Sequence, residues 1–330
     1  MKLVISIDVE EEGLFSGEYP RTPPGVTNVA RLRHLEFIPR DFGLPLTLLV
    51  TYHVAQDPGA RQVLSKWRDR YGAEIGAHLH PWNTPPFRAL PLPEPVRSEN
   101  LPWPLLREKL LNLTTTLKDL LGVVPRSFRM GRFDWGPRVL SLLPEFGFQV
   151  DSSMVPLTYK IGGPDHFLAP ADPFWLPYSG PDGTRLLEAP VTMVPLWARA
   201  PRKIYGLSAA LPVKWGQLLL TWFSFFQAAG VHPAWFPLPP MQWAVRLYRR
   251  RGGQVLNMFL HSTELLPGAS PACPTEEAVQ RLVGKIRLFL TWLRQTGPLQ
   301  GVTLSQLYQD YGGSAAEGSR GGGPGFASGS

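Results

Sequence analysis

The stretch KLVISIDVE, residues 2–10, decides the fold of this 330-residue protein. Its apolar run ends at Asp8, and further acids follow at Glu10, Glu11 and Glu12. A buried strand with carboxylates at its carboxyl end is typical of α/β sheets and barrels, which build their sites at that edge. A secretory leader would not tolerate these acids. We therefore expect a buried strand in a cytoplasmic protein.

The composition excludes several classes of protein. Hydrophobic residues make up 44% of the chain and charged residues 18%, which gives enough apolar surface for a folded core. The net charge of +7 is spread thinly. The densest basic cluster, residues 249–251, is too short for a nucleic-acid tract, so no nucleic-acid partner is expected. Cys273 is the only cysteine, which excludes an intramolecular disulfide and a thiolate metal site.

Short apolar runs alternate with helical stretches along the chain, the pattern of a parallel sheet or barrel. Further strands are expected at residues 45–51, 74–78, 127–129, 148–151, 185–188, 255–261 and 302–304. Helices are expected at residues 62–70, 105–121, 138–146 and 276–294. The Gly/Ser-rich residues 312–330 are expected to form a disordered tail.

Residues 199–251 depart from this β/α rhythm and are rich in tryptophan. Their nine-residue apolar run, residues 218–226, is far shorter than the roughly 20 residues needed to span a bilayer. Two interpretations stay open: a helical subdomain packed on the barrel, or an amphipathic lid that touches a membrane or a lipid-linked substrate. In the second, downstream basic residues would meet lipid phosphates: Arg246, Arg249, Arg250 and Arg251.

Two pairs of side chains with metal-binding chemistry stand at predicted strand ends. Asp8 and Glu10 are two residues apart, as are His78 and His80, so each pair projects from one face of its strand. Imidazole and carboxylate ligands without a thiolate indicate one divalent metal ion at an open catalytic site, with Zn²⁺ as the first choice. The neighbouring acids Glu11 and Glu12 are expected to face water.

Two more strands end in residues suited to catalysis. His261 ends residues 255–261, and an imidazole there can protonate a leaving group near neutral pH. Arg129 ends residues 127–129, where its guanidinium can hold a carboxylate by paired hydrogen bonds.

This ordered set of strand ends resembles the polysaccharide deacetylase family (NodB-like, carbohydrate esterase family 4). The matching segments are SIDVE (residues 6–10), EIGAH (74–78), FRMGRF (128–133), GFQVDSS (147–153) and LH (260–261). The resemblance covers residues 1–310, with residues 199–251 outside the family pattern. It implies a distorted (β/α) barrel of the NodB type as a catalytic domain.

The resemblance also implies roles for the site residues. Asp8 corresponds to the general base, Arg129 to the residue that orients it, and His261 to the general acid. Val9 stands where the family usually has a metal-binding Asp, so the resemblance assigns the metal to Glu10, His78 and His80. Here the family's second metal histidine is replaced by tryptophan, and His53 is a reserve ligand. The expected substrate-binding residues are Trp82, Arg132 and Phe133.

The implied reaction is metal-dependent hydrolysis of an N- or O-acetyl group on a saccharide, nucleotide-linked or lipid-linked, in surface-polysaccharide assembly. Two alternatives stay open. One is a non-catalytic, sugar-binding relative that has lost its metal. The other is an amidohydrolase-type metal-dependent hydrolase, although there the His-x-His pair follows the first strand, which here carries acids.

Overall fold

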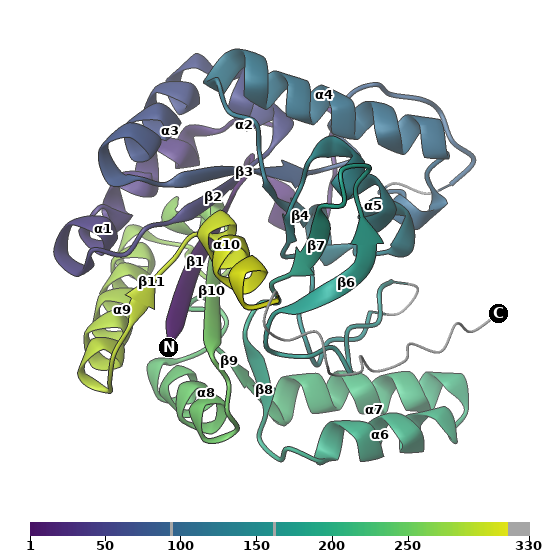
Figure 1. Ribbon diagram of the computed structural model, residues 1–330, viewed down its shortest axis with the longest axis vertical. Coiled ribbons are helices and arrows are strands. Elements are labelled where there is room, and N and C mark those ends of the chain that lie inside the picture. The colour runs from purple at the N-terminus through teal and green to yellow at the C-terminus, as the bar shows by residue number, and fades with distance from the viewer. Residues whose placement is uncertain (93–94, 161–162, 316–330) are drawn as a thin grey trace.

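The computed structural model describes residues 1–92, 95–160 and 163–315, and a curved sheet forms its centre (Figure 1). The strands are β1 (Lys2–Val9), β2 (Thr47–Val50), β3 (Glu74–Leu79), β4 (Ser127–Met130), β5 (Val150–Asp151), β6 (Phe174–Ser179), β7 (Arg185–Glu188), β10 (Val255–His261) and β11 (Gln300–Gly301). Their order is β10-β1-β2-β3-β4-β5-β7-β6, with β11 beside β1. All pairs are parallel except β6 with β7. The α/β fold and the distorted barrel are therefore confirmed.

Alternation along β1 separates the outer core from the barrel interior. Leu3, Ile5, Ile7 and Val9 belong to the main hydrophobic core, while the residues between them point to the other face. Val4 packs in a separate apolar cluster with β2, β5 and β7, and Ser6 and Asp8 follow it toward the carboxyl end. The interior thus changes from apolar to polar along the strand, and the polar end is where the site residues lie.

Helices surround this sheet (Figure 1). They are α1 (Phe37–Phe42), α2 (Tyr52–Gln56), α3 (Pro58–Tyr71), α4 (Trp103–Leu121), α5 (Pro137–Leu142), α8 (Leu238–Arg250), α9 (Glu276–Gln295) and α10 (Leu304–Ala315). Local sequence fixes their ends: Asp57 caps the start of α3, Thr275 caps α9, and α4 stops at Gly122 with φ +66°. Leucines of α4 at helical spacing join the main core.

The segment at residues 199–251 adds α6 (Ala200–Ala209), α7 (Val213–Phe226) and the short strand β9 (Ala228–Gly230), which pairs with β8 (Met193–Pro195). Helix α8 closes the segment, and its buried residues join the main core. Helices α6 and α7 lie side by side along one edge of the molecule, at the bottom of Figure 1. Among the described residues, no helix is both long and apolar enough to span a membrane.

The C-terminal region differs from the sequence prediction. The strand expected at residues 302–304 is wrong: β11 ends at Gly301 and α10 begins at Leu304. Thr303 and Gln306 cap this helix reciprocally, at 2.9 and 3.2 Å, and Leu307 is buried under the sheet. The helix reaches Ala315, past the predicted start of the tail, and residues 316–330 lie outside the described residues.

Candidate metal and catalytic site

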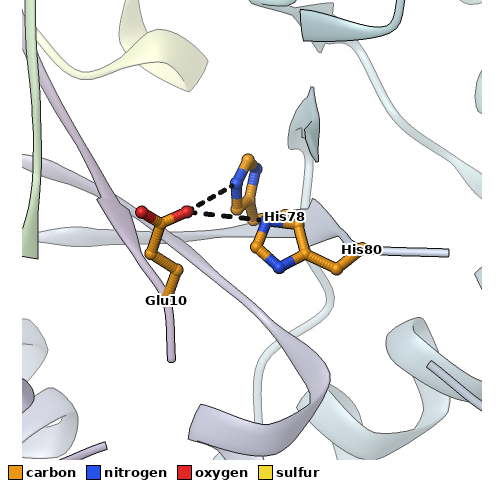
Figure 2. Close-up of side chains that lie close together, drawn as sticks. All are labelled: Glu10, His78 and His80. Atoms are coloured by element: carbon orange, nitrogen blue, oxygen red, sulfur yellow. Dashed lines mark ion pairs between the residues drawn. The ribbon is translucent and has the colours of Figure 1, made fainter. Parts of the chain in front are cut away.

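Three metal-ligand side chains converge at the carboxyl ends of β1 and β3 (Figure 2). Glu10 Oε2 lies 3.5 Å from Nε2 of His78 and 3.5 Å from Nε2 of His80. Ligands at about 2.0–2.1 Å from a tetrahedral ion are about 3.4 Å apart, so this spacing fits one divalent cation. All three side chains are buried. The donor set and its geometry fit the metal that the sequence predicts.

The remaining imidazole nitrogens are fixed by hydrogen bonds that leave both Nε2 atoms free for a metal. His78 Nδ1 donates to the Arg129 carbonyl oxygen at 2.9 Å, and His80 Nδ1 donates to Glu11 Oε1 at 2.6 Å. Thr51 Oγ1 donates to the other carboxylate oxygen of Glu11 at 2.8 Å, and Asn83 also donates to Glu11.

The expectation that Glu11 faces water is therefore wrong. This side chain is fully buried. Burial raises the pKa of Glu11, but His80 and Asn83 outweigh that effect and hold it at about 2. Glu11 follows the end of β1 at Val9 and turns toward His80 rather than toward solvent. Glu12 is partly exposed, and its carboxylate accepts hydrogen bonds from Thr27 and Asn28 at the start of a 3₁₀ helix, Thr27–Leu35.

Asp8 and Arg129 form a buried ion pair beside the metal ligands. Arg129 Nη1 donates to Asp8 Oδ1 at 2.6 Å, and Asp8 Oδ2 lies 3.8 Å from His78 Nε2. Burial raises the pKa of Asp8, but the charges of Arg129, His78 and His261 together bring it below its usual value. Asp8 is thus held as a carboxylate at neutral pH.

A belt of hydrogen bonds inside the barrel fixes Arg129. Its Nη2 donates to Ser6 Oγ and Ser152 Oγ at 2.8 Å each, and its Nε donates to the Ser152 carbonyl oxygen at 2.7 Å. Asn257 on β10 bonds Ser6 at 3.0 Å and Ser152 at 3.0 Å. Its amide also donates to the Ala189 carbonyl oxygen, which links β10 to the segment after β7. These bonds tie the two sides of the barrel together below the site.

His261 lies across from the metal ligands and is held by an acid that the sequence reasoning missed. Its Nδ1 donates to Glu264 Oε1 at 3.1 Å, which leaves Nε2 4.0 Å from Asp8 Oδ2. His232, from the segment after β9, is buried with its Nε2 3.6 Å from the same Glu264 oxygen. Burial lowers the pKa of His261, but Glu10, Glu264 and Asp8 raise it to about 9.

These residues line one cavity of about 320 Å³ that contains Asp8, Glu10, His78, His80 and His261. The three residues predicted to bind substrate lie in its wall: Trp82, Arg132 and Phe133. Trp82 stacks on His80 with ring centroids 4.3 Å apart, and both aromatic side chains are largely buried. Arg132 is exposed and lies over the Tyr19 ring. Trp235, from the predicted insertion, also lines the cavity.

The reserve ligand His53 lies outside this group. Its Nε2 pairs with the Arg21 carbonyl oxygen at 3.0 Å, and it is not among the residues that converge near Glu10. Two further buried acids, Asp151 and Glu188, face each other on β5 and β7. Burial and the charge of Asp151 raise the pKa of Glu188 well above its usual value, so this pair holds a proton.

Sequence reasoning missed Glu11, His232 and Glu264. A signal for Glu264 is present, because His261 and Glu264 have the spacing of a reciprocal helix cap and form one. His232 has no such signal, since it meets Glu264 only through the fold.

Comparison with known proteins identifies the fold. No family model matches the chain, and no curated protein is significantly similar to it in sequence. A candidate polysaccharide deacetylase from Mycobacterium smegmatis has a TM-score of 0.58 at 18% identity, covering 95% of this chain and 91% of that one. A candidate polysaccharide deacetylase from Pseudomonas aeruginosa PAO1 scores 0.56 at 16% identity, covering 94% and 90%. Puue allantoinase scores 0.58 at 15% identity, covering 95% and 90%.

The chain thus has the fold of the polysaccharide deacetylases, the NodB-like fold of carbohydrate esterase family 4. The sequence resemblance to that fold is confirmed.

Proposed function

We propose that this protein is a metal-dependent deacetylase that hydrolyses an N- or O-acetyl group on a saccharide. The observation that supports this most is a single cavity containing the ligand set Glu10, His78 and His80 together with Asp8 and His261. The fold shared with solved polysaccharide deacetylases makes acyl hydrolysis the reaction to test first.

The side chains can divide the work of hydrolysis. A divalent cation on Glu10, His78 and His80 would supply Lewis-acid activation of water and of the acyl carbonyl. Asp8 accepts the proton of the attacking water, since its lowered pKa keeps it ionised. Arg129 holds Asp8 in place through the 2.6 Å hydrogen bond. His261, protonated because its pKa is raised to about 9, donates a proton to the departing amine or alkoxide.

The cavity wall supports a saccharide that carries phosphate. Trp82, Phe133 and Trp235 offer aromatic surface for a sugar ring. Arg132 and Lys160 add positive charge beside them, and a smaller cavity of about 150 Å³ also lies against both. A nucleotide-linked or lipid-linked saccharide, as used in surface-polysaccharide assembly inside the cell, combines a sugar with such a phosphate.

A second candidate is hydrolysis of a cyclic amide. The solved allantoinase matches the fold with the same TM-score as the deacetylase from Mycobacterium smegmatis, so the scaffold alone favours neither substrate. The same metal ligands and the Asp8 base would serve that reaction.

The test compares wild-type protein with His78→Ala and His53→Ala. Protein purified without chelator is analysed for metal and assayed on acetylated saccharides, phosphate-linked saccharides and allantoin. We expect about one divalent ion per chain, release of acetate, and loss of both in His78→Ala but not in His53→Ala. Full metal occupancy in His78→Ala would contradict the ligand assignment. If the wild-type protein binds one metal ion per chain but releases no acetate, the proposed deacetylase activity is wrong. If the wild-type protein binds no metal, it is instead a non-catalytic, sugar-binding relative.

A matched variant tests the base. Asp8→Asn keeps the size of the side chain and its contact with Arg129, and should lower the rate by roughly 10²–10⁴-fold. Its metal content should stay at the wild-type level, because Asp8 is not among the three ligands.

A further inference from the structure

Helix α7 is mostly apolar, yet only one of its apolar stripes is buried. Gly216, Leu220 and Phe223 face the body of the protein, and Phe223 packs on Phe167 with ring centroids 5.4 Å apart. The opposite side leaves large side chains in solvent: Trp215 is 61% exposed, Trp222 48%, Phe225 76% and Phe226 66%. A helix in water normally turns its apolar stripe toward the core and polar residues toward solvent. The outer stripe of α7 is therefore a surface that requires a partner.

The apolar surface continues beyond α7. Gly216 lets α6 approach closely, because a Cβ there would lie 2.4 Å from the Ser208 carbonyl oxygen. Leu207 of α6, Leu211 and Trp197 are also exposed. We call this surface the α6–α7 face, comprising Trp197, Leu207, Leu211, Val213, Trp215, Leu218, Trp222, Phe225 and Phe226. Monomeric proteins rarely leave so many large apolar side chains together in water.

The charges that α6 and α7 themselves carry have one sign. Between Glu188 and Glu264 the sequence contains no Asp or Glu. The exposed charged residues are Arg199, just before α6, Arg202 and Lys203 on α6, and Lys214 on α7. On the inner side of α6, Tyr205 stacks on Phe167 and donates to Asp165 at 2.7 Å. Tryptophan and phenylalanine beside lysine and arginine, without acids, are typical of helices that lie in the interface of anionic membranes.

Three of the four arginines that the lid hypothesis places at lipid phosphates contact other parts of the protein. Arg249 donates to the Thr296 carbonyl oxygen at 2.9 Å, and Arg251 donates to the Pro195 carbonyl oxygen at 2.6 Å. Arg246 lies over the Trp292 ring, 5.2 Å from its centroid. These three side chains stabilise the contacts of α8 within the protein.

The inner side of α7 packs against a segment that lines the catalytic cavity. On the inner side of α7, Gln217 donates to the Tyr159 hydroxyl at 3.3 Å, and Ser224 donates to the Leu157 carbonyl oxygen. The segment that receives these bonds contributes Val155, Thr158 and Lys160 to the cavity wall. A partner bound to the outer side of α7 would therefore lie one helix away from a segment of the catalytic cavity wall.

We propose that the α6–α7 face docks on the surface of a lipid bilayer that contains anionic lipids. The exposed aromatic side chains enter the headgroup region, and the lysines and arginines meet lipid phosphates. This inference depends on exposure and charge alone, so it holds whatever reaction the cavity performs.

The experiment is co-sedimentation of the full chain with two kinds of vesicle. One kind is phosphatidylcholine alone, and the other contains about 30% phosphatidylglycerol, an anionic lipid. We expect binding to the anionic vesicles only, falling as salt is raised. Trp222→Ser with Phe225→Ser should weaken it by roughly ten-fold or more, because apolar area is lost. Lys203→Gln with Lys214→Gln should weaken it by about five-fold per charge. The matched control is Leu111→Ser with Leu288→Ser, exposed residues on α4 and α9 away from this edge (Figure 1), and it should bind normally.

Melting temperature and solution mass decide what the result means. The Trp222/Phe225 variant should keep the wild-type melting temperature, because both side chains are exposed. If this variant melts at a much lower temperature but binds vesicles as the wild type does, the proposal is wrong, because the two side chains then belong to the core. A wild-type dimer that dissociates in this variant, with no vesicle binding, would overturn it in favour of a second copy of the chain. Unaltered binding by the lysine variant would overturn the phosphate contacts.

Discussion

His80 donates its Nδ1 proton to a fully buried Glu11, at 2.6 Å. This bond fixes the tautomer of His80, so that its Nε2 lone pair faces Glu10 and the metal position. Glu11 is in turn held by Thr51 and Asn83. The second histidine of the site thus depends on a carboxylate that is not itself one of the three proposed metal ligands.

Glu11→Gln should weaken metal binding by about 10–100-fold while leaving the three ligands in place, because the charge that orients and polarises His80 is lost. Competition with a chelator measures this change. Glu12→Gln is the matched control, since the neighbouring Glu12 caps a 3₁₀ helix and should not affect metal affinity. Equal affinities in the two variants would remove Glu11 from the site.

Gly131→Ala should distort the same histidine by direct contact. A Cβ at Gly131 would lie 2.4 Å from Cδ2 of His80 and 2.8 Å from the Leu79 carbonyl oxygen, closer than real Cβ atoms approach. Metal affinity should fall although no ligand is changed. Gly206→Ala, on α6, has open space around its Cβ and serves as the control. Metal titration that finds both variants equal to wild type would show that the chain beside His80 can move.

Glu264→Gln should move the alkaline limb of the pH–rate profile to lower pH. Glu264 is one of the charges that raise the pKa of His261 to about 9. The protonated imidazole is the acid, so the rate falls as pH rises through this pKa, and a lower pKa brings the fall earlier. Glu276→Gln, an exposed acid that pairs with Arg31, provides the comparison. A limb at the same pH in both variants would exclude Glu264 from this role.

Glu188→Gln should make the protein more stable at alkaline pH. The folded state binds a proton at Glu188 that the unfolded chain releases near its usual pKa of 4.5, so the free energy of unfolding falls as pH rises above that value. The free energy of unfolding should fall by up to about 1.4 kcal/mol per pH unit, which corresponds to one proton released on unfolding. This dependence on pH should disappear in Glu188→Gln. Urea unfolding at pH 5, 6.5 and 8 tests this, with exposed Glu108→Gln as reference.

The sequence predicts the sheet well where a largely apolar strand has a polar side chain at its last or next-to-last position. β1, β3 and β10 have this form, which also brought their terminal side chains to one edge. β6 was missed because Phe174–Ser179 is half exposed and contains a proline, so it lacks a buried strand's apolar run. Its position depends on pairing with β7 rather than on local preference.

The site could be predicted where the spacing of residues along one strand determines which face their side chains share. The i, i+2 pairs place Asp8 with Glu10 and His78 with His80 on common faces. Glu11 was assigned to water because the acids after β1 were interpreted as a solvated strand-to-loop junction. The contact between His232 and Glu264, and that between Asp151 and Glu188, join segments distant in the chain, and no local pattern encodes them.

The pairing of β1 with β10 affects the order in which the protein can form during synthesis. β1 pairs along its length with β10, from Lys2 opposite Val255 to Asp8 opposite His261. β1 therefore lacks one neighbour until β10, about 250 residues later in the chain, has been made. Pairing over such a separation is slow because a long loop must close first. Until then the nascent chain carries an unpaired apolar edge, which makes it a client for chaperones.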